Sequence, residues 1–163
     1  MYNKYLEIKS SKTGKGVFTK IQIPAKAPII EFTGDIIPKD KLNLDPSQFL
    51  QVGFDRFIGP SGSIDDYINH NCKPNCLVSI VGNRAILYSL YVIPKGYELT
   101  FDYSTSSTDT LDTWKMNCNC GSFNCRKVIS GYQYLSESIK KEYVEKGMVP
   151  VFITNPNFYA KKW

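Results

Sequence analysis

Histidine and cysteine side chains, which can bind a metal ion, are concentrated in two short stretches of this chain. The stretch INHNCKPNC, residues 68–76, holds the only histidine, His70, and two of the five cysteines, Cys72 and Cys76. The stretch NCNCGSFNCR holds the other three, in a C-x-C-x4-C pattern: Cys118, Cys120 and Cys125. Structural zinc sites take four tetrahedral ligands, and cysteine thiolates lie about 2.3 Å from the ion. The second stretch therefore predicts three ligands of a zinc site whose fourth ligand comes from elsewhere.

The fourth ligand of this predicted site is open between three side chains of the first stretch. Cys72 and Cys76 are the remaining thiols, and His70 is a further candidate. An alternative is that the three downstream cysteines are buried and bind nothing. Gly121 and the polar residues around it favour ligands over core packing. Five cysteines in a chain that shows no secretory signal also favour metal binding or chemistry over disulfides.

The length and composition predict one folded domain. A chain of 163 residues with 42% hydrophobic and 13% aromatic residues can form a core. No apolar run approaches the roughly 18 residues that a membrane-spanning helix needs, so we expect no membrane partner. The start, MYNKYLEIKSSKTGKG, has no apolar segment after a basic one, so we expect no secretory signal. A soluble intracellular protein, nuclear or cytoplasmic, is the expectation.

The net charge of +5 is distributed unevenly along the chain. Residues 1–44 carry a net charge of +4, residues 45–113 carry −4 and residues 114–163 carry +5. Nucleic-acid binders more often carry a dense stripe of Arg and Lys, and only three residues here are Arg, so we expect no direct nucleic-acid binding. Solvated surface lysines account for the charge as a whole. An acidic groove in the middle region would suit a basic peptide.

Short strands dominate the predicted secondary structure, because Pro, Gly and Asn interrupt the apolar runs. The residues VGN at 81–83 predict a tight hairpin turn between two of these strands. The polar stretch STSSTDTLDT, residues 104–113, has little to bury and predicts a loop. The eight expected strands cover residues 5–9, 16–18, 29–32, 49–52, 56–58, 77–81, 84–90 and 98–101.

One helix is expected near the end, from about residue 136 to 146. Ser136 is a suitable N-cap, and Gly147 is suited to end the helix. Leu135, Ile139 and Tyr143 share one face of such a helix, which predicts that this face packs on the rest of the protein. The sequence pattern as a whole indicates a mainly β fold with few helices.

Five segments occur in a recognisable order: GKGVF (14–18), EFTGD (31–35), YINHNCKPNC (67–76), ELTFDY (98–103) and CNCGSFNCR (118–126). In this order they resemble the SET-domain family of protein lysine methyltransferases, over roughly residues 5–130. The resemblance implies several small sheets, a knot-like C-terminal threading and no pre-SET domain. It divides the chain into a SET core at 1–113, a zinc-binding post-SET segment at 114–130, and a C-terminal helix and tail at 131–163.

The resemblance also implies an activity, which is methyl transfer from S-adenosylmethionine to the side-chain amine of lysine in a protein substrate, such as a histone tail or another Lys-rich protein. Tyr103 then matches the catalytic tyrosine. The cofactor would be held by Tyr103 and by Lys15, Gly16, Val17, Phe18, Asn69 and His70. The lysine channel would contain Phe32, Phe101 and Tyr67. One structural zinc ion would be bound by Cys72, Cys118, Cys120 and Cys125, leaving Cys76 outside the site.

Phe101 stands where the family has either Phe or Tyr, and a Phe there implies di- or trimethyllysine as product. Four positions depart from the family pattern. Phe32 and Asp35 replace the Tyr and Glu of the E-Y-x-G-E segment, and Asp66 with Tyr67 replaces an Arg-Phe pair common before the N-H motif. The first departure supports an alternative, an inactive SET-like module that binds basic protein tails. A zinc-stabilised nucleic-acid-binding domain is a further alternative, supported only by the tail FYAKKW.

Overall fold

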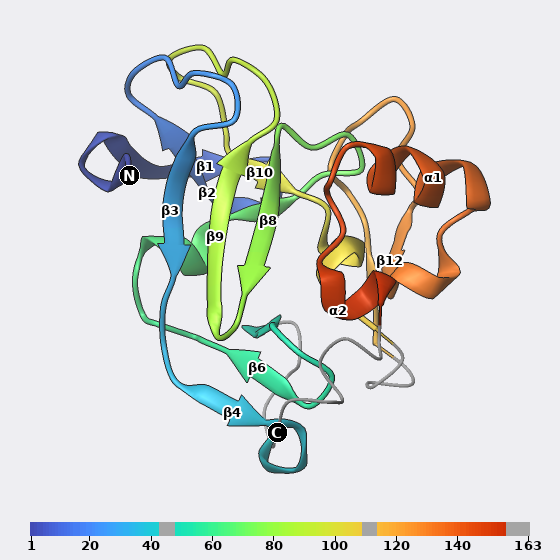
Figure 1. The fold of residues 1–163 in the computed structure, drawn as a ribbon. Helices are drawn as coiled ribbons and strands as arrows, with labels where there is room; N and C mark the ends of the chain where they lie inside the picture. The colour runs from blue at the N-terminus through green and yellow to red at the C-terminus, as the bar shows by residue number, and fades with distance from the viewer. Residues whose placement is uncertain (43–47, 109–113, 156–163) are drawn as a thin grey trace.

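The computed structural model describes residues 1–42, 48–108 and 114–155. Within these ranges the strands form five small sheets. The hairpin β1 (Leu6–Ser11) and β2 (Gly14–Thr19) is one of them. Strands β3 (Pro28–Phe32), β9 (Arg84–Ser89) and β8 (Cys76–Val81) form an antiparallel sheet at the centre of the molecule (Figure 1). The others are β4 (Ile36–Pro38) with β6 (Arg56–Ile58) and β5 (Leu50–Gln51), β7 (Asn69–His70) with β10 (Thr100–Phe101), and β11 (Lys115–Asn117) with β12 (Val128–Ser130).

The predicted mainly β class is confirmed, and each of the eight expected strand regions contains a strand. The VGN hairpin is also confirmed, because Val81 pairs with Arg84 and Gly82 has a φ of 60°. Four short strands were not predicted: β4, β7, β11 and β12. Each has only two or three residues, too few for an alternating pattern to appear in the sequence. The predicted knot-like threading stays a prediction.

The predicted loop at 104–113 is wrong over its first residues. Residues Tyr103–Ser106 form the 3-10 helix η5, in which Ser104, Thr105 and Ser106 are buried. Their polar groups are satisfied locally, because the Thr105 hydroxyl donates to the Asp102 carbonyl and the Ser106 hydroxyl to the Tyr103 carbonyl. Polar side chains can therefore be buried here at little cost. Residues 109–113 of this loop, and the tail FYAKKW, lie outside the described residues.

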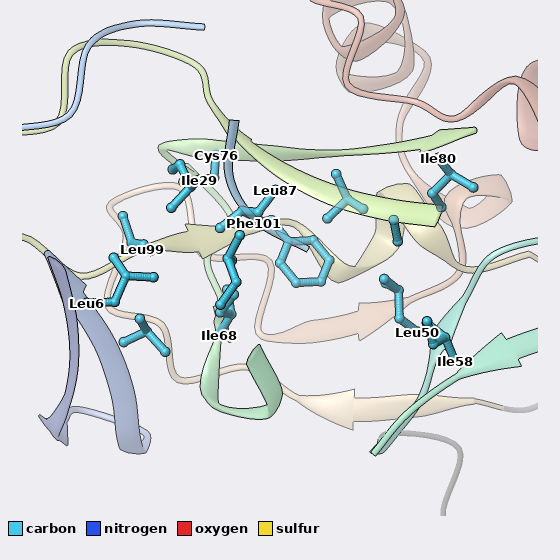
Figure 2. Close-up of a cluster of buried hydrophobic side chains, with 14 of the residues drawn as sticks. Leu6, Ile29, Leu50, Ile58, Ile68, Cys76, Ile80, Leu87, Leu99 and Phe101 are labelled. Atoms are coloured by element: carbon cyan, nitrogen blue, oxygen red, sulfur yellow. The ribbon is translucent and has the colours of Figure 1, made fainter. Parts of the chain in front are cut away.

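The main hydrophobic core lies between the central sheet and the strands that surround it. Figure 2 shows Leu6, Ile29, Ile68, Leu87 and Leu99 meeting there, although they come from widely separated parts of the chain. The core also contains Cys76, which is fully buried. Phe101 reaches this core from β10 and is 4% exposed. Hydrophobic packing thus fixes the position of Phe101, which directly precedes Asp102 and Tyr103 in the sequence.

The parallel pair β7–β10 brings the N-H motif beside the FDY motif. Thr100 pairs with Asn69 and Phe101 with His70, and the Asn71 amide donates to the Phe101 carbonyl over 3.1 Å. Asn75 reinforces this arrangement, because its side-chain oxygen accepts from the Thr100 amide and its side-chain nitrogen donates to the Glu98 carbonyl. Motifs about 30 residues apart in the sequence therefore form one site.

The expected C-terminal helix is confirmed as α1 (Glu137–Glu145), with the Ser136 hydroxyl accepting from the Ile139 amide as its N-cap. Its buried face packs with Leu135, Tyr143 and Met148 in a second hydrophobic cluster. Figure 1 shows α1 and the short helix α2 (Val151–Thr154) together on the side of the molecule where β12 lies. Among the described residues, no helix combines the length and apolar character needed to cross a membrane.

Candidate active site and metal centre

Tyr103 stands between two cavities and lines both of them. It begins η5 immediately after β10, and its hydroxyl donates to the Ile68 carbonyl over 2.7 Å. Burial raises the pKa of this phenol above its ordinary value, and the charge of Glu98 acts in the same direction. The hydroxyl is therefore neutral, and its single hydrogen is already engaged.

The first cavity has a volume of about 90 Å³ and aromatic walls, which include Phe32, Phe101 and Tyr103. The Phe101 ring lies 4.8 Å from the Tyr103 ring and 5.9 Å from the Phe32 ring, measured between centroids. Two of the three residues expected in a lysine channel therefore meet beside Tyr103. The third, Tyr67, does not line this cavity, and its ring lies 5.7 Å from the Lys15 ammonium instead.

The second cavity, of about 310 Å³, lies on the other side of Tyr103 and is bordered by Asn69 and His70. Its size falls at the lower end of the usual range for small-molecule sites. Lys12 and Thr13, in the turn of the β1–β2 hairpin, line it as well. The four residues of β2 expected to hold a cofactor do not line this cavity: Lys15, Gly16, Val17 and Phe18.

The β2 segment acts on the second cavity indirectly, by holding the side chain of Asn69. Val17 is fully buried in the hydrophobic core. The Asn69 side-chain amide donates to the Lys15 carbonyl over 2.9 Å and to a Glu98 carboxylate oxygen over 2.7 Å. Gly16 lies against this pair, since a Cβ at that position would be 2.1 Å from Glu98 Oε1. A side chain at this position would therefore displace the Glu98 carboxylate and the Asn69 amide, and the cluster fixes the orientation of Asn69.

His70 is 7% exposed and lies between Tyr103, Asp102 and Cys72. Its Nδ1 accepts from the Tyr103 amide over 3.2 Å, so the ring hydrogen is on Nε2, which lies 3.2 Å from Cys72 Sγ. Burial lowers the pKa of His70 to about 4, against the opposite effect of Asp102. The ring is therefore neutral near pH 7 and is a hydrogen-bond donor toward the sulfur.

The Asp102 carboxylate is fully buried and accepts four hydrogen bonds. Both of its carboxylate oxygens accept from the Arg126 guanidinium over 2.7 Å. The Tyr143 hydroxyl donates to Oδ2 over 2.8 Å and the Ser104 amide donates to Oδ1 over 3.0 Å. The pair with Arg126 ties the SET core to the cysteine-rich segment.

Four cysteine sulfurs gather at the end of the second cavity. Cys118 Sγ lies 3.7 Å from Cys72 Sγ and 3.6 Å from Cys125 Sγ. Four thiolates about 2.3 Å from one ion stand about 3.8 Å apart, so both distances fit a tetrahedral zinc site. Cys120 belongs to the same group, since its sulfur, those of Cys72 and Cys118, and a ring nitrogen of His70 lie within 4.8 Å of one another. Cys76 lies in the core instead.

The environment of these thiols differs from one to the next. Burial raises the pKa of Cys72 to about 11, while a hydrogen bond from the Lys127 amide is the main cause that lowers the pKa of Cys125 to about 7. The Arg126 amide also points at Cys72 Sγ, 3.4 Å away. A bound cation would let all four thiolates coexist, because each carries a negative charge and they lie in contact.

Sequence reasoning missed three charged residues of the site: Glu98, Asp102 and Arg126. Glu98 and Asp102 stand inside the quoted segment ELTFDY, and Arg126 closes CNCGSFNCR. An acid within an otherwise apolar strand segment was the available signal, because a charge is rarely buried without a partner. The partners themselves lie far away in sequence, as with Ser11, whose hydroxyl donates to Glu98.

This fold belongs to a known class. The sequence profile of the SET domain matches residues 14–104, and the chain therefore belongs to the SET domain family. It is 31% identical over 140 residues to the histone-lysine N-methyltransferase trr of Drosophila melanogaster, covering 77% of this chain and 6% of that protein. It is 33% identical over 134 residues to the histone-lysine N-methyltransferase NSD3 of Mus musculus, covering 72% and 9%. The chain thus spans less than a tenth of the length of either relative.

A solved structure shares the fold. The crystal structure of KRYPTONITE in complex with mCHH DNA, an H3(1–15) peptide and SAH matches 77% of this chain and 29% of that chain. The TM-score is 0.62 and the sequence identity is 28%. The predicted SET-domain family and fold class are confirmed by these matches.

Proposed function

We propose that this chain transfers a methyl group from S-adenosylmethionine to the side-chain amine of lysine in a protein substrate. The observation that carries this proposal is the position of Tyr103, which lines both a narrow cavity with Phe32 and Phe101 in its wall and a larger cavity bordered by Asn69 and His70. Two substrates that enter from opposite sides would meet at its hydroxyl. The relatives named as histone-lysine methyltransferases, and the KRYPTONITE complex with SAH and a histone peptide, support the same activity.

The role of Tyr103 is to orient the amine. Its hydroxyl hydrogen is donated to the Ile68 carbonyl, so the oxygen lone pairs remain free to accept from the neutral amine. Phe32 and Phe101 line the narrow cavity, and burial of the amine against these rings penalises its charged form, whereas Asp65 and Asp66, which line the same cavity, would attract the charged lysine as it enters. Alignment and desolvation are what this reaction needs from the protein, since no covalent enzyme intermediate is formed.

The larger cavity fits the methyl donor. S-adenosylmethionine, when bound, supplies an electrophilic methyl group on a sulfonium, which leaves as the neutral thioether. Asn69 and His70 would hold it, and the chain positions both through fixed partners, Glu98 for the first and the Tyr103 amide for the second. The contribution of the Lys15–Phe18 stretch would be indirect, because those residues support Asn69 and do not line the cavity.

The four clustered cysteines would bind one structural zinc ion: Cys72, Cys118, Cys120 and Cys125. His70 is the less suitable candidate for a ligand, because its Nε2 carries the ring hydrogen and a metal ligand needs a lone pair there. The ion would hold the post-SET segment at 114–130 against the second cavity, whose wall includes Cys118 and Cys120. Metal binding would thereby complete the site without taking part in the chemistry.

A labelled methyl-transfer assay tests the proposal. Zinc-loaded protein is incubated with labelled S-adenosylmethionine and either core histones or a Lys-rich cell extract, and S-adenosylhomocysteine binding is measured by calorimetry in parallel. Replacing Tyr103 with Phe should reduce turnover by about 10²-fold or more with little change in binding. Tyr97→Phe removes a hydroxyl from a residue that is 59% exposed and is the matched control. Full activity of Tyr103→Phe would remove Tyr103 from the mechanism.

The same assay decides between an enzyme and a binding module. Cofactor binding without labelled protein from any substrate would favour a SET-like module that holds basic tails, which is the alternative that Phe32 supports. Labelled histones would identify the substrate class, and a labelled band from the extract would be sequenced to find the lysine.

Phe101 bears on the number of methyl groups transferred. Its ring is 4% exposed and adjoins both Tyr103 and Phe32, so the channel wall has no hydroxyl at this point. We propose di- or trimethyllysine as the product. A Phe101→Tyr variant should shift the products toward monomethyllysine, which mass spectrometry of a peptide substrate under excess cofactor would measure. Monomethyllysine alone from the wild type would contradict the proposal.

A further inference from the structure

Lys127 has a left-handed backbone conformation, which residues with a side chain rarely adopt. Its φ is 66°, and among the described residues Lys26 is the other non-glycine residue with a positive φ. The eight remaining positive values belong to glycines, and Gly121, with a φ of 79°, lies in the same cysteine-rich segment. The conformation is costly for a lysine because its Cβ comes close to the following carbonyl oxygen. The surroundings of Lys127 therefore hold its backbone in place.

The backbone groups of Lys127 face two of the proposed zinc ligands. Its amide donates to Cys125 Sγ, and its carbonyl accepts from the Cys118 amide over 2.7 Å. The preceding amide, that of Arg126, donates to Cys72 Sγ over 3.4 Å. The φ and ψ angles of Lys127 set the direction of its carbonyl relative to its amide. The left-handed turn is thus what lets one residue contact both cysteine loops.

The chain on either side of Lys127 is anchored to the rest of the protein. Arg126 pairs with the buried Asp102, and Ile129 is 2% exposed. The hairpin that follows is short, because β12 pairs with β11 over three residues, and two strands of this length are marginal without further support. The Lys127 side chain is exposed, so burial does not fix it. The cysteine loops are then the main constraint on the turn between these anchors.

We propose that Lys127 is a positioning residue of the metal centre and that the zinc ion holds its backbone in the left-handed conformation. Binding of the ion would draw together the loops that carry Cys118 and Cys125, and the turn at Lys127 absorbs this closure. The strain keeps the affinity for zinc below the value that a glycine at this position would give. The inference rests on the zinc site of the proposed function and does not depend on methyl transfer or on the cofactor.

Glycine and alanine at position 127 isolate the backbone effect, because both variants lack the lysine charge. Lys127→Gly should bind zinc about fivefold more tightly than Lys127→Ala, since glycine avoids the left-handed penalty and its greater flexibility offsets only part of this gain. Lys127→Asn should lie between them, because asparagine adopts this conformation more readily than alanine. Competition of the reduced protein with a chromophoric chelator measures each affinity, and the cobalt(II) spectrum checks that every variant uses the same thiolate ligands.

Lys115 provides the matched control. It is an exposed lysine of the same segment, and it lies in β11, where the backbone is extended. Lys115→Gly should bind zinc no more tightly than Lys115→Ala, because glycine weakens a strand. A gain from glycine at position 127 without a gain at position 115 would assign the effect to the left-handed turn.

The conformation of Lys127 can also be observed directly. A positive φ brings the amide and Hα hydrogens of one residue close together, so the zinc-loaded wild type should show a strong intraresidue nuclear Overhauser cross-peak for Lys127 that weakens when a chelator removes the ion. Equal affinities of the Gly and Ala variants, or a cross-peak that does not change without zinc, would overturn this inference alone. Wild-type protein that binds no zinc would reject the proposed metal site and this inference with it. Zinc-loaded protein that binds no S-adenosylhomocysteine would count only against the proposed enzyme activity.

Discussion

Replacing Gly16 with Ala tests whether the Asn69–Glu98 cluster supports the cofactor site. The added Cβ would lie 2.1 Å from Glu98 Oε1 and 2.8 Å from Asn69 Nδ2, both far inside van der Waals contact. The Glu98 carboxylate must move, because the backbone of β2 is paired with β1 on its other side. Movement breaks the hydrogen bonds that Glu98 accepts from Asn69 and from Ser11.

The expected cost follows from these contacts. Overpacking of this kind costs about 1–3 kcal/mol, and a lost hydrogen bond to a charged group costs about 1.5 kcal/mol or more. We therefore expect the free energy of unfolding to fall by about 3 kcal/mol, taking a partly relaxed site into account. For a chain of this size that is a decrease of about 6–12 °C in Tm. Asn69 also loses its orientation, so S-adenosylhomocysteine binding should weaken at least tenfold.

Urea denaturation, followed by circular dichroism, measures the stability, and calorimetry measures the binding. Gly53→Ala is the control, since its added Cβ would meet only the flexible Arg56 side chain at 3.3 Å. It should stay within about 1 kcal/mol of the wild type. A Gly16→Ala variant as stable as the control, with wild-type affinity, would refute the argument that Glu98 and Asn69 form one fixed support.

Three further predictions concern the rest of the site. Arg126→Met leaves Asp102 buried without a cation, so the free energy of unfolding should fall by about 3–5 kcal/mol; a loss below 1 kcal/mol in urea would contradict the pairing. Cys120→Ser should lower the zinc content per chain measured by mass spectrometry, while Cys76→Ala keeps it; unchanged zinc in the first would exclude Cys120 as a ligand. Because burial raises the pKa of Tyr103, the transfer rate should not decline near pH 10, where an ordinary tyrosine ionises. A decline near pH 10 that is absent in Tyr103→Phe would show that Tyr103 ionises there and would contradict the raised pKa.

The longer elements were predictable from sequence because each has an internal pattern. Residues 84–90 carry a short run of apolar and aromatic side chains directly after the VGN turn, which indicates β9, and the Ser136 cap with Gly147 bounds α1. Strand β7 has only two residues and pairs in parallel with β10, so nothing local could indicate it. Its existence depends on a contact between residues about 30 positions apart, which periodicity does not report.

The site residues divide in the same way, into those with a local sequence signal and those without one. The motif residues Tyr103, Asn69 and His70 were identified from sequence, and the structure brings them together around the two cavities. Glu98 and Asp102 act through partners that local sequence does not indicate, since an acid in an apolar strand segment signals a paired charge without saying which distant residue is its partner. Tyr143 was predicted only as part of an apolar helix face. Its hydroxyl contacts Asp102, which directly precedes η5, and no local sequence pattern indicates that contact.

The order of Asp102 and its partners along the chain has a consequence for protein synthesis. A ribosome produces Asp102 before Arg126 and Tyr143, which follow 24 and 41 residues later. A buried carboxylate without partners is unstable, so the segment that carries Tyr103 has to wait for downstream sequence before it can take its final place. A nascent chain arrested before residue 143 should therefore already contain the central sheet and still lack the Asp102 pairs beside Tyr103, so the proposed methyl transfer would be confined to chains whose C-terminal helix has emerged.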